Sequence, residues 1–269
     1  MSAMGEKIRL DALLVLQGKA PSRERARAVI MAGNVYLDGN RLLKPGISVA
    51  RTANPEVREP AIPYVSRGGL KLEKALDAFG VDVKERDCID CGASTGGFTD
   101  CLLQRGARRV WAVDVGYGQL DWRIRQDSRV TVMERTNVRY LKPEDLDGTP
   151  SLGVIDLSFI SLGLVLPAVY GLLEAEGEVL CLVKPQFEAG REQVGKKGVV
   201  KDPAIHQKVL EQFAADAAGA GFGVLALDYS PVKGPQGNIE YLGYLGKGKP
   251  SAPDLDIQAV VGESHGRLD

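Results

Sequence analysis

Residues 90–99 read Asp-Cys-Gly-Ala-Ser-Thr-Gly-Gly-Phe-Thr, and this stretch decides the fold of the chain. Its first two residues end an apolar-flanked run, 88–91, that is typical of a strand. A helical pattern begins at Phe98. Three glycines within six residues let a ligand approach the backbone closely, because no Cβ stands in the way. Asp90 adds a carboxylate, so the turn suits a ligand that carries both an anionic group and a cation. A glycine-rich turn without a ligand stays the alternative at this point.

Strands and helices alternate from residue 81 onward. We expect strands near 87–91, 109–114, 130–133, 152–157, 178–184, 222–229 and 239–245, and helices near 69–79, 97–105, 118–126, 161–174 and 203–219. This alternation predicts an α/β fold with a mostly parallel sheet. Residues 230–238 are too few for a helical crossover between the last two strands, so the last strand should be antiparallel.

Charged residues stand at the expected strand ends. Ligands of such sheets bind beyond the carboxyl ends of the strands. Asp114 lies 24 residues after Asp90, which is the spacing of a carboxylate that hydrogen-bonds ribose hydroxyls. An antiparallel last strand begins at the rim where its parallel neighbours end, so one rim should collect four ionisable residues: Lys71, Asp156, Lys184 and Glu240. Such a group is costly unless its members pair or do chemistry, and structural ion pairs are the alternative.

The N-terminal part of the chain is basic. Residues 1–74 hold 13 Lys and Arg against 7 Asp and Glu, although the whole chain has a net charge of −1. This asymmetry suggests an anionic partner at the N-terminal side. Residues 6–17 predict an amphipathic helix, Ser22 is a suitable cap for a second helix, and the Asp38–Gly39 pair predicts a hairpin.

Composition excludes several classes of protein. Four cysteines in 269 residues do not form a disulfide framework, and the pair Cys88 and Cys91 has no second pair to complete a zinc site, so we expect no metal. Only two histidines, His206 and His265, are present, which argues against Ser-His-Asp and Cys-His catalysis. No apolar run reaches the length of a membrane span, and the N-terminus lacks the apolar core of a signal peptide. We therefore expect a cytoplasmic protein.

The basic N-terminal module resembles the S4 RNA-binding domain. The resemblance rests on Leu10-Asp11, on the run 22–26 and on the run 33–39. It implies that the following basic residues contact RNA phosphates: Arg23, Arg27, Lys44 and, beyond the module, Arg67. Such contacts supply affinity and position but little sequence choice. A solvated arginine face is the alternative.

The rest of the chain resembles the FtsJ-like ribose 2′-O-methyltransferases, and the whole is similar to the TlyA (hemolysin A) family. Five motifs carry this resemblance: 66–72, 90–100, 112–120, 156–162 and 183–188. The order of Lys71, Asp156, Lys184 and Glu240 looks like the K-D-K-E tetrad of these enzymes. One departure is visible, since Ala61–Val65 replaces an R-x-W-V-D-Y-like interdomain sequence of some members.

The resemblance implies S-adenosylmethionine as methyl donor and a ribose of ribosomal RNA, of cytidine type, as acceptor. Lys184 would serve as base or hydroxyl activator, and the sequence leaves its protonation state open. The partner would be ribosomal RNA or a ribosomal subunit, and the oligomeric state is open. The implied cofactor-binding residues are Asp90, Gly92, Ser94, Thr95, Gly96, Gly97, Phe98, Asp114, Glu134, Asn137 and Asp156.

These assignments divide the chain into four parts. We expect an S4-like α+β domain over 6–60, a linker over 61–68, a Rossmann-like methyltransferase domain over 69–247 and a disordered tail over 248–269. Two other functions stay open, a non-catalytic ribosome- or RNA-binding factor and a membrane-active hemolysin. The intact glycine turn and the complete tetrad argue against the first, and the composition argues against the second.

Overall fold

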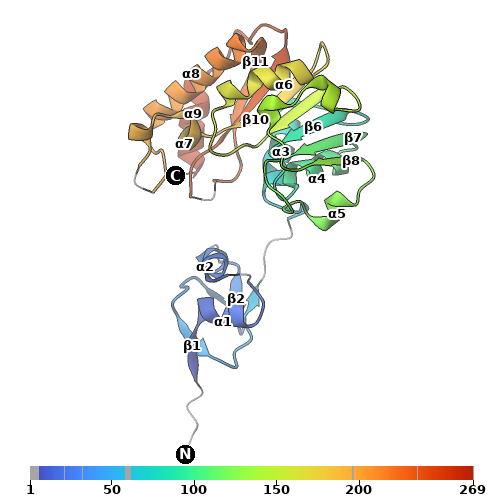
Figure 1. Ribbon diagram of the computed structural model, residues 1–269. Helices are drawn as coiled ribbons and strands as arrows, with labels where there is room; N and C mark the ends of the chain where they lie inside the picture. Colours follow the sequence, from blue (N-terminus) through green and yellow to red (C-terminus); the bar gives the residue numbers. More distant parts are fainter. Residues whose placement is uncertain are drawn as a thin grey trace, which may run out of the picture. The chain divides into compact units, whose positions relative to one another are not determined.

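The computed structural model describes residues 6–20, 22–31, 33–57, 62–195, 197–234 and 236–268. The chain forms two compact units, Met1–Ile62 and Pro63–Asp269 (Figure 1). The second unit begins inside the segment that the sequence analysis assigned to a linker, so residues 63–68 belong to the larger unit.

The small unit combines two helices with short antiparallel strands. Its elements are β1 (Lys7–Arg9), α1 (Leu10–Leu16), α2 (Arg23–Met31), β2 (Val35–Leu37), β3 (Asn40–Leu42), β4 (Ser48–Ala50) and β5 (Glu56–Val57). Fully buried Leu10, Leu13 and Leu14 of α1 pack against Ile30 of α2 in one core. The β2–β3 hairpin turns at Asp38 and Gly39, both with positive φ, as a two-residue turn of primed type requires. The hairpin predicted from the sequence is thus confirmed.

The larger unit is a layered α/β domain. Its strands are β6 (Asp87–Cys91), β7 (Arg109–Val113), β8 (Val130–Met133), β9 (Leu152–Ile155), β10 (Glu178–Val183), β11 (Phe222–Tyr229) and β12 (Tyr241–Lys247). They form one sheet in the order β11-β12-β10-β9-β6-β7-β8. The pairs between β8, β7, β6, β9 and β10 are parallel, whereas β12 is antiparallel to both β10 and β11. This confirms the expected mostly parallel sheet with an antiparallel last strand.

Helices cover the sheet. They are α3 (Gly68–Phe79), α4 (Gly97–Gln104), α5 (Trp122–Arg125), α6 (Leu166–Leu172), α7 (Pro185–Glu188), α8 (Pro203–Gly219) and α9 (Ile257–Leu268). Helices α3 and α4 pack together, and α8 packs on α9 and on β11 (Figure 1). The main core joins strand residues such as Trp111 and Tyr241 with Phe213 of α8. The glycine-rich turn lies between β6 and α4, at the carboxyl ends of the parallel strands.

The C-terminal segment differs from the expected disordered tail. Residues 257–268 form α9, in which Val261 and Ser264 are buried. His206 of α8 is fully buried and bonds Tyr241, which in turn bonds Ser264. The apolar positions of this segment are few and separated by glycines, so its order comes from docking onto α8 and β11 rather than from local helix preference.

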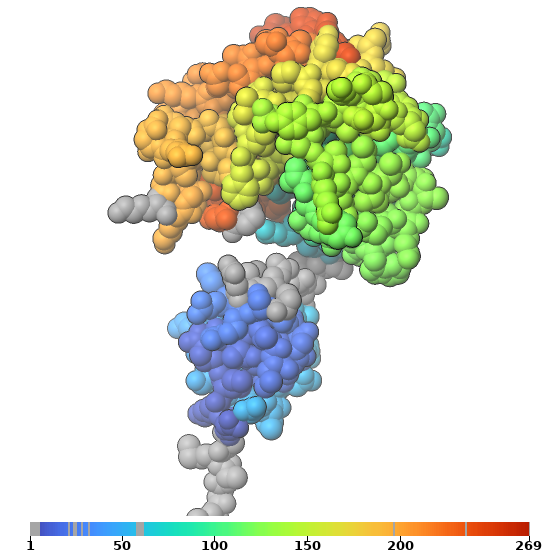
Figure 2. Space-filling model, in the orientation of Figure 1, coloured from blue at the N-terminus to red at the C-terminus, as the bar shows by residue number. Residues whose placement is uncertain are grey.

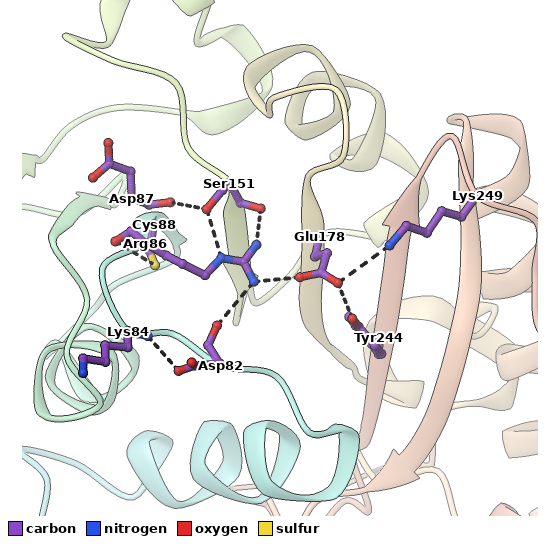
Figure 3. A network of polar contacts seen from close by, with 9 residues as sticks. All are labelled: Asp82, Lys84, Arg86, Asp87, Cys88, Ser151, Glu178, Tyr244 and Lys249. Carbon is purple, nitrogen blue, oxygen red and sulfur yellow. Dashed lines mark hydrogen bonds and ion pairs between the residues drawn. The ribbon is translucent and has the colours of Figure 1, made fainter.

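A polar network joins the strand starts at the edge of the sheet opposite to the glycine turn (Figure 3). The Arg86 guanidinium donates to Glu178 Oε2 at 2.7 Å and to the Ser151 Oγ and carbonyl oxygen at 3.0 and 2.6 Å. Tyr244 of β12 donates to the other oxygen of Glu178. Burial opposes the ionisation of Glu178, but the hydrogen bonds from Tyr244 and Arg86 outweigh it and hold its pKa below the usual value.

We expect Glu178→Gln to lower the free energy of unfolding by about 1–2 kcal/mol at pH 7, because the charge-assisted bond to Arg86 is weakened. A lowered carboxyl pKa contributes stability above the unfolded-state pKa and loses it as the pH falls through the folded-state pKa. The difference from the wild type should therefore shrink below about pH 4.3. Urea unfolding at several pH values checks this, with exposed Glu176→Gln as control. An equal deficit at all pH values would contradict it.

Candidate active site

The glycine turn brings the backbone of two strand ends into close contact. Gly92 has φ +97°, and a Cβ there would lie 2.6 Å from the backbone oxygen of Asp156. A Cβ on Gly97 would lie 2.2 Å from Ser66 Oγ. Both distances exclude a side chain without rearrangement. Glycine at these two positions therefore lets the turn pack closely against Asp156, just after β9, and against Ser66.

Two carboxylates implied for cofactor binding, Asp114 and Glu134, also hold the loops around the turn. Asp114 accepts hydrogen bonds from the backbone N–H groups of Ser94 and Gly116, at 2.8 and 2.7 Å. Glu134 accepts one from Gly118 N at 2.8 Å and pairs with Arg125. Both carboxylates line a narrow recess of about 10 Å³ beside the turn. Gly116, Gln119 and Leu120 of the segment after β7 also line this recess.

Asn137, implied for cofactor binding, caps a short turn after β8. Its Oδ1 accepts a hydrogen bond from Arg139 N at 3.1 Å and so caps the 3₁₀ turn Val138–Tyr140. It is absent from the described lining of both the recess and the larger cleft. An asparagine just after a strand end can equally be a cap or a ligand residue, and the sequence alone does not separate the two.

Asp90 lies at the base of the turn and is fully buried. Thr99 Oγ1 donates a hydrogen bond to its Oδ2 at 2.6 Å, whereas its Oδ1 has no partner among the described residues. Burial raises the pKa of Asp90 to about 7, and the nearby charges of Asp156 and Asp114 add to the shift. A buried, half-satisfied carboxyl group next to an open glycine turn is typical of a binding site rather than of a stability element.

We expect Asp90 to make the unliganded protein less stable as the pH rises. Its folded-state pKa lies above the unfolded-state value, so its contribution is fully present below about pH 4 and is lost as the pH passes through about 7. Asp90→Asn should remove this dependence, and its stability relative to the wild type should rise between pH 5 and pH 8. Urea unfolding across this range measures the effect, with exposed Asp254→Asn as control. A difference that does not change with pH would refute the assignment.

The four ionisable residues that the sequence placed on one rim form two ion pairs. Lys71, in the first turn of α3, lies 2.5 Å from Glu240 Oε2, just before β12. Lys184, just after β10, lies 2.5 Å from Asp156 Oδ1, just after β9. Three of the four residues are buried, and the Asp156 side chain is 21% exposed. The structure therefore brings the predicted residues together and shows which of them pair.

Both ion pairs line one cleft of about 1010 Å³. The glycine turn, Ser66 and Arg67, and the segment after β10 complete its lining. In the space-filling view, the green segments of this unit lie on the right and its orange segments on the upper left (Figure 2). Arg67 is exposed at the cleft, as expected for a residue that meets RNA. The cleft is large enough for a cofactor and part of a second substrate.

The sequence analysis assigned no role to three residues of this cleft. Ser158 Oγ lies 3.3 Å from Lys184 Nζ. Phe159 is 89% exposed, has φ +65° and lies with its ring 4.9 Å from that of Phe187. A non-glycine residue in the left-handed region that exposes an apolar ring is unfavourable on both counts, so a functional reason is indicated. The sequence contains a signal, an aromatic residue three positions after a strand-end aspartate, but exposure cannot be read from it.

In the small unit, Arg23 and Arg27, which were implied for RNA binding, surround one carboxylate together with Arg9. Asp11 is fully buried, and Arg9, Arg23 and Arg27 lie 2.9, 3.1 and 3.3 Å from its Oδ2. Hydrogen bonds from Arg9 and Arg23 hold the pKa of Asp11 well below its usual value. The arginine side chains are still about half exposed, so three cations around one anion leave positive charge at the surface. Lys44 is exposed between β3 and β4.

Each of the two units matches a known protein family. The model of the FtsJ-like methyltransferases matches residues 64–247, and that of the S4 domain matches residues 8–51. The 16S/23S rRNA (cytidine-2′-O)-methyltransferase TlyA of Mycobacterium tuberculosis is 48% identical over 90% of this chain and 91% of its own. Hemolysin A of Brachyspira hyodysenteriae is 41% identical over 88% of this chain and 99% of its own.

A solved structure of a Streptococcus thermophilus protein described as a hemolysin is 49% identical, covers 97% of this chain and 96% of its own, and superimposes with a TM-score of 0.80. In the part of the chain that the structure describes, no helix has the length and apolar character needed to cross a membrane. The chain therefore belongs to the FtsJ-like methyltransferases, with an S4 domain at its N-terminal end.

Proposed function

We propose that this protein transfers a methyl group from S-adenosylmethionine to the 2′-hydroxyl of a ribose, of cytidine type, in ribosomal RNA. The two buried lysine–carboxylate pairs that share one cleft with the glycine turn carry this proposal. The names of relatives such as the M. tuberculosis enzyme support the substrate. The S4 domain supports RNA as the partner.

The residues at the turn fit the cofactor. The glycine turn lines the cleft through Gly92 and Gly97, where no side chain covers the backbone that a cofactor would meet. Asp90 Oδ1 is a buried acceptor with no described partner, which suits a cation close by. Asp114 and Glu134 would meet the ribose hydroxyls once the recess opens. Bound there, the cofactor would supply an electrophilic methyl group.

Lys184 would orient and deprotonate the acceptor. Its amine nitrogen contacts Asp156 and Ser158, and its remaining tetrahedral position is available to a hydroxyl group in the cleft. The hydroxyl proton would pass to this nitrogen when the amine is neutral. Lys71, paired with Glu240, fixes the start of α3 against the start of β12. Positioning of the hydroxyl contributes alongside the proton transfer.

We expect Lys184→Ala to lower the single-turnover rate of methyl transfer by about 10²–10⁴-fold, the range for loss of a positioned acid–base group. Affinity for S-adenosylhomocysteine should be retained, since the glycine turn is untouched. Radiolabelled methyl transfer to unmodified ribosomal RNA measures the rate, and calorimetry measures the affinity. Lys208→Ala on the exposed face of α8 is the control. Unchanged turnover would remove Lys184 from the mechanism.

We infer that Phe159 provides a stacking surface for the acceptor nucleobase. Its ring is exposed, lies in the cleft lining near Lys184 and is supported by Phe187. Every nucleobase has a face that stacks on an aromatic ring, worth about 1–3 kcal/mol per base.

Phe159→Ala should therefore raise KM for RNA by about 5- to 150-fold, and Phe159→Tyr should restore most of the loss. Leu164→Ala removes another exposed apolar side chain and serves as control. Methylation assays over a range of RNA concentrations measure KM. Equal effects of the Phe159 and Leu164 substitutions would argue against stacking.

A further inference from the structure

The arginines of the larger unit differ in whether a carboxylate neutralises their charge. Ion pairs with carboxylates hold Arg86, Arg105, Arg108, Arg109, Arg123, Arg125 and Arg129. By contrast, Arg67 and Arg191 are exposed, line the cleft and form no ion pair with any described residue. Lys197 shares these three properties. The cations whose charge is not neutralised by a neighbour therefore include three at the cleft.

The charges of the cleft are unbalanced. Glu240 neutralises Lys71 and Asp156 neutralises Lys184, so the three outer cations leave the described lining with a net charge of +3. The whole chain has a net charge of −1, so this excess is local. S-adenosylmethionine carries a sulfonium cation and a zwitterionic amino acid group, so it has no net negative charge that three cations would neutralise. These cations suit an anionic ligand instead.

The three cations come from two separate segments. Arg67 directly precedes α3, the helix that carries Lys71 four residues later. Arg191 and Lys197 belong to the segment that follows α7 and Lys184. Arg67 therefore lies on the same segment as Lys71, and Arg191 and Lys197 lie on the same segment as Lys184. An acceptor ribose placed at Lys184 carries a phosphate on either side along its strand, which matches cations contributed by both segments.

We propose that Arg67, Arg191 and Lys197, here named the rim cations, bind the phosphates that flank the acceptor ribose of a single-stranded RNA segment. The inference deepens the proposed function and rests on it for the location of the acceptor. Phosphate contacts fix register and orientation without reading sequence. The rim cations would thus hold the strand so that one 2′-hydroxyl faces Lys184, independently of the contacts made by the small unit.

Salt dependence of RNA binding by the full chain tests the rim cations. The variant Arg67→Gln/Arg191→Gln/Lys197→Gln is compared with Lys84→Gln/Lys208→Gln/Arg267→Gln, which removes the same charge from exposed positions outside the cleft. The probe is a fluorescently labelled ten-nucleotide oligocytidylate. The slope of log K against log salt is negative, and each lost phosphate contact on a single strand reduces its magnitude by about 0.7. We expect a fall of about 2 for the rim variant and little change for the control.

Two further measurements separate the possible failures. If the triple variant folds poorly, the double variant Arg191→Gln/Lys197→Gln replaces it, because it leaves α3 untouched. This variant should reduce the magnitude of the slope by about 1.4. Methylation of ribosomal RNA by the wild type tests the proposed function by itself. If the wild type methylates ribosomal RNA but the rim and control variants have equal slopes, the phosphate-binding role of the rim cations is refuted and the proposed function stands. A lowered slope without any methylation would uphold RNA binding at the cleft and overturn the proposed function.

Discussion

The buried ion pair between Lys71 and Glu240 is the constraint on which the rest of the larger unit depends. The two residues are 169 positions apart and meet at 2.5 Å, with the Glu240 side chain 1% exposed. Removing one partner of a buried pair costs about 3–5 kcal/mol, because the other charge is left without compensation. The pair can form only if β12 begins at the rim where β9 and β10 end. It thus requires the antiparallel insertion of β12 between β10 and β11.

In the proposed reaction, the same rim would separate a donor side from an acceptor side. On the donor side, Gly92 and Gly97 line the cleft without side chains, and Asp90 retains a buried oxygen without a described partner. On the acceptor side, Lys184 lies between Asp156 and Ser158. Both sides are fixed by strand ends of one sheet, which is rigid. A methyl group and a hydroxyl can therefore be brought together by binding alone, which accounts for much of the rate gain in transfers of this kind.

The distribution of positive charge explains why a nearly neutral protein suits RNA. In the small unit Asp11 holds three arginines by one buried carboxylate and leaves excess positive charge on their exposed ends. In the larger unit most arginines are neutralised locally, whereas the rim cations are not. Attraction for a polyanion thus comes from two confined surfaces rather than from net charge.

The amino-acid sequence by itself determined the alternation of strands and helices, the glycine turn, the antiparallel last strand and the rim that holds the four ionisable residues, because these follow from local patterns and from the geometry of parallel sheets. The tertiary structure alone decided which lysine pairs with which carboxylate, that Phe159 is exposed, that Asn137 is a cap, and that residues 257–268 fold as α9. These features depend on contacts between residues far apart in the chain. Their free energy comes from burial and charge pairing, which no local pattern encodes.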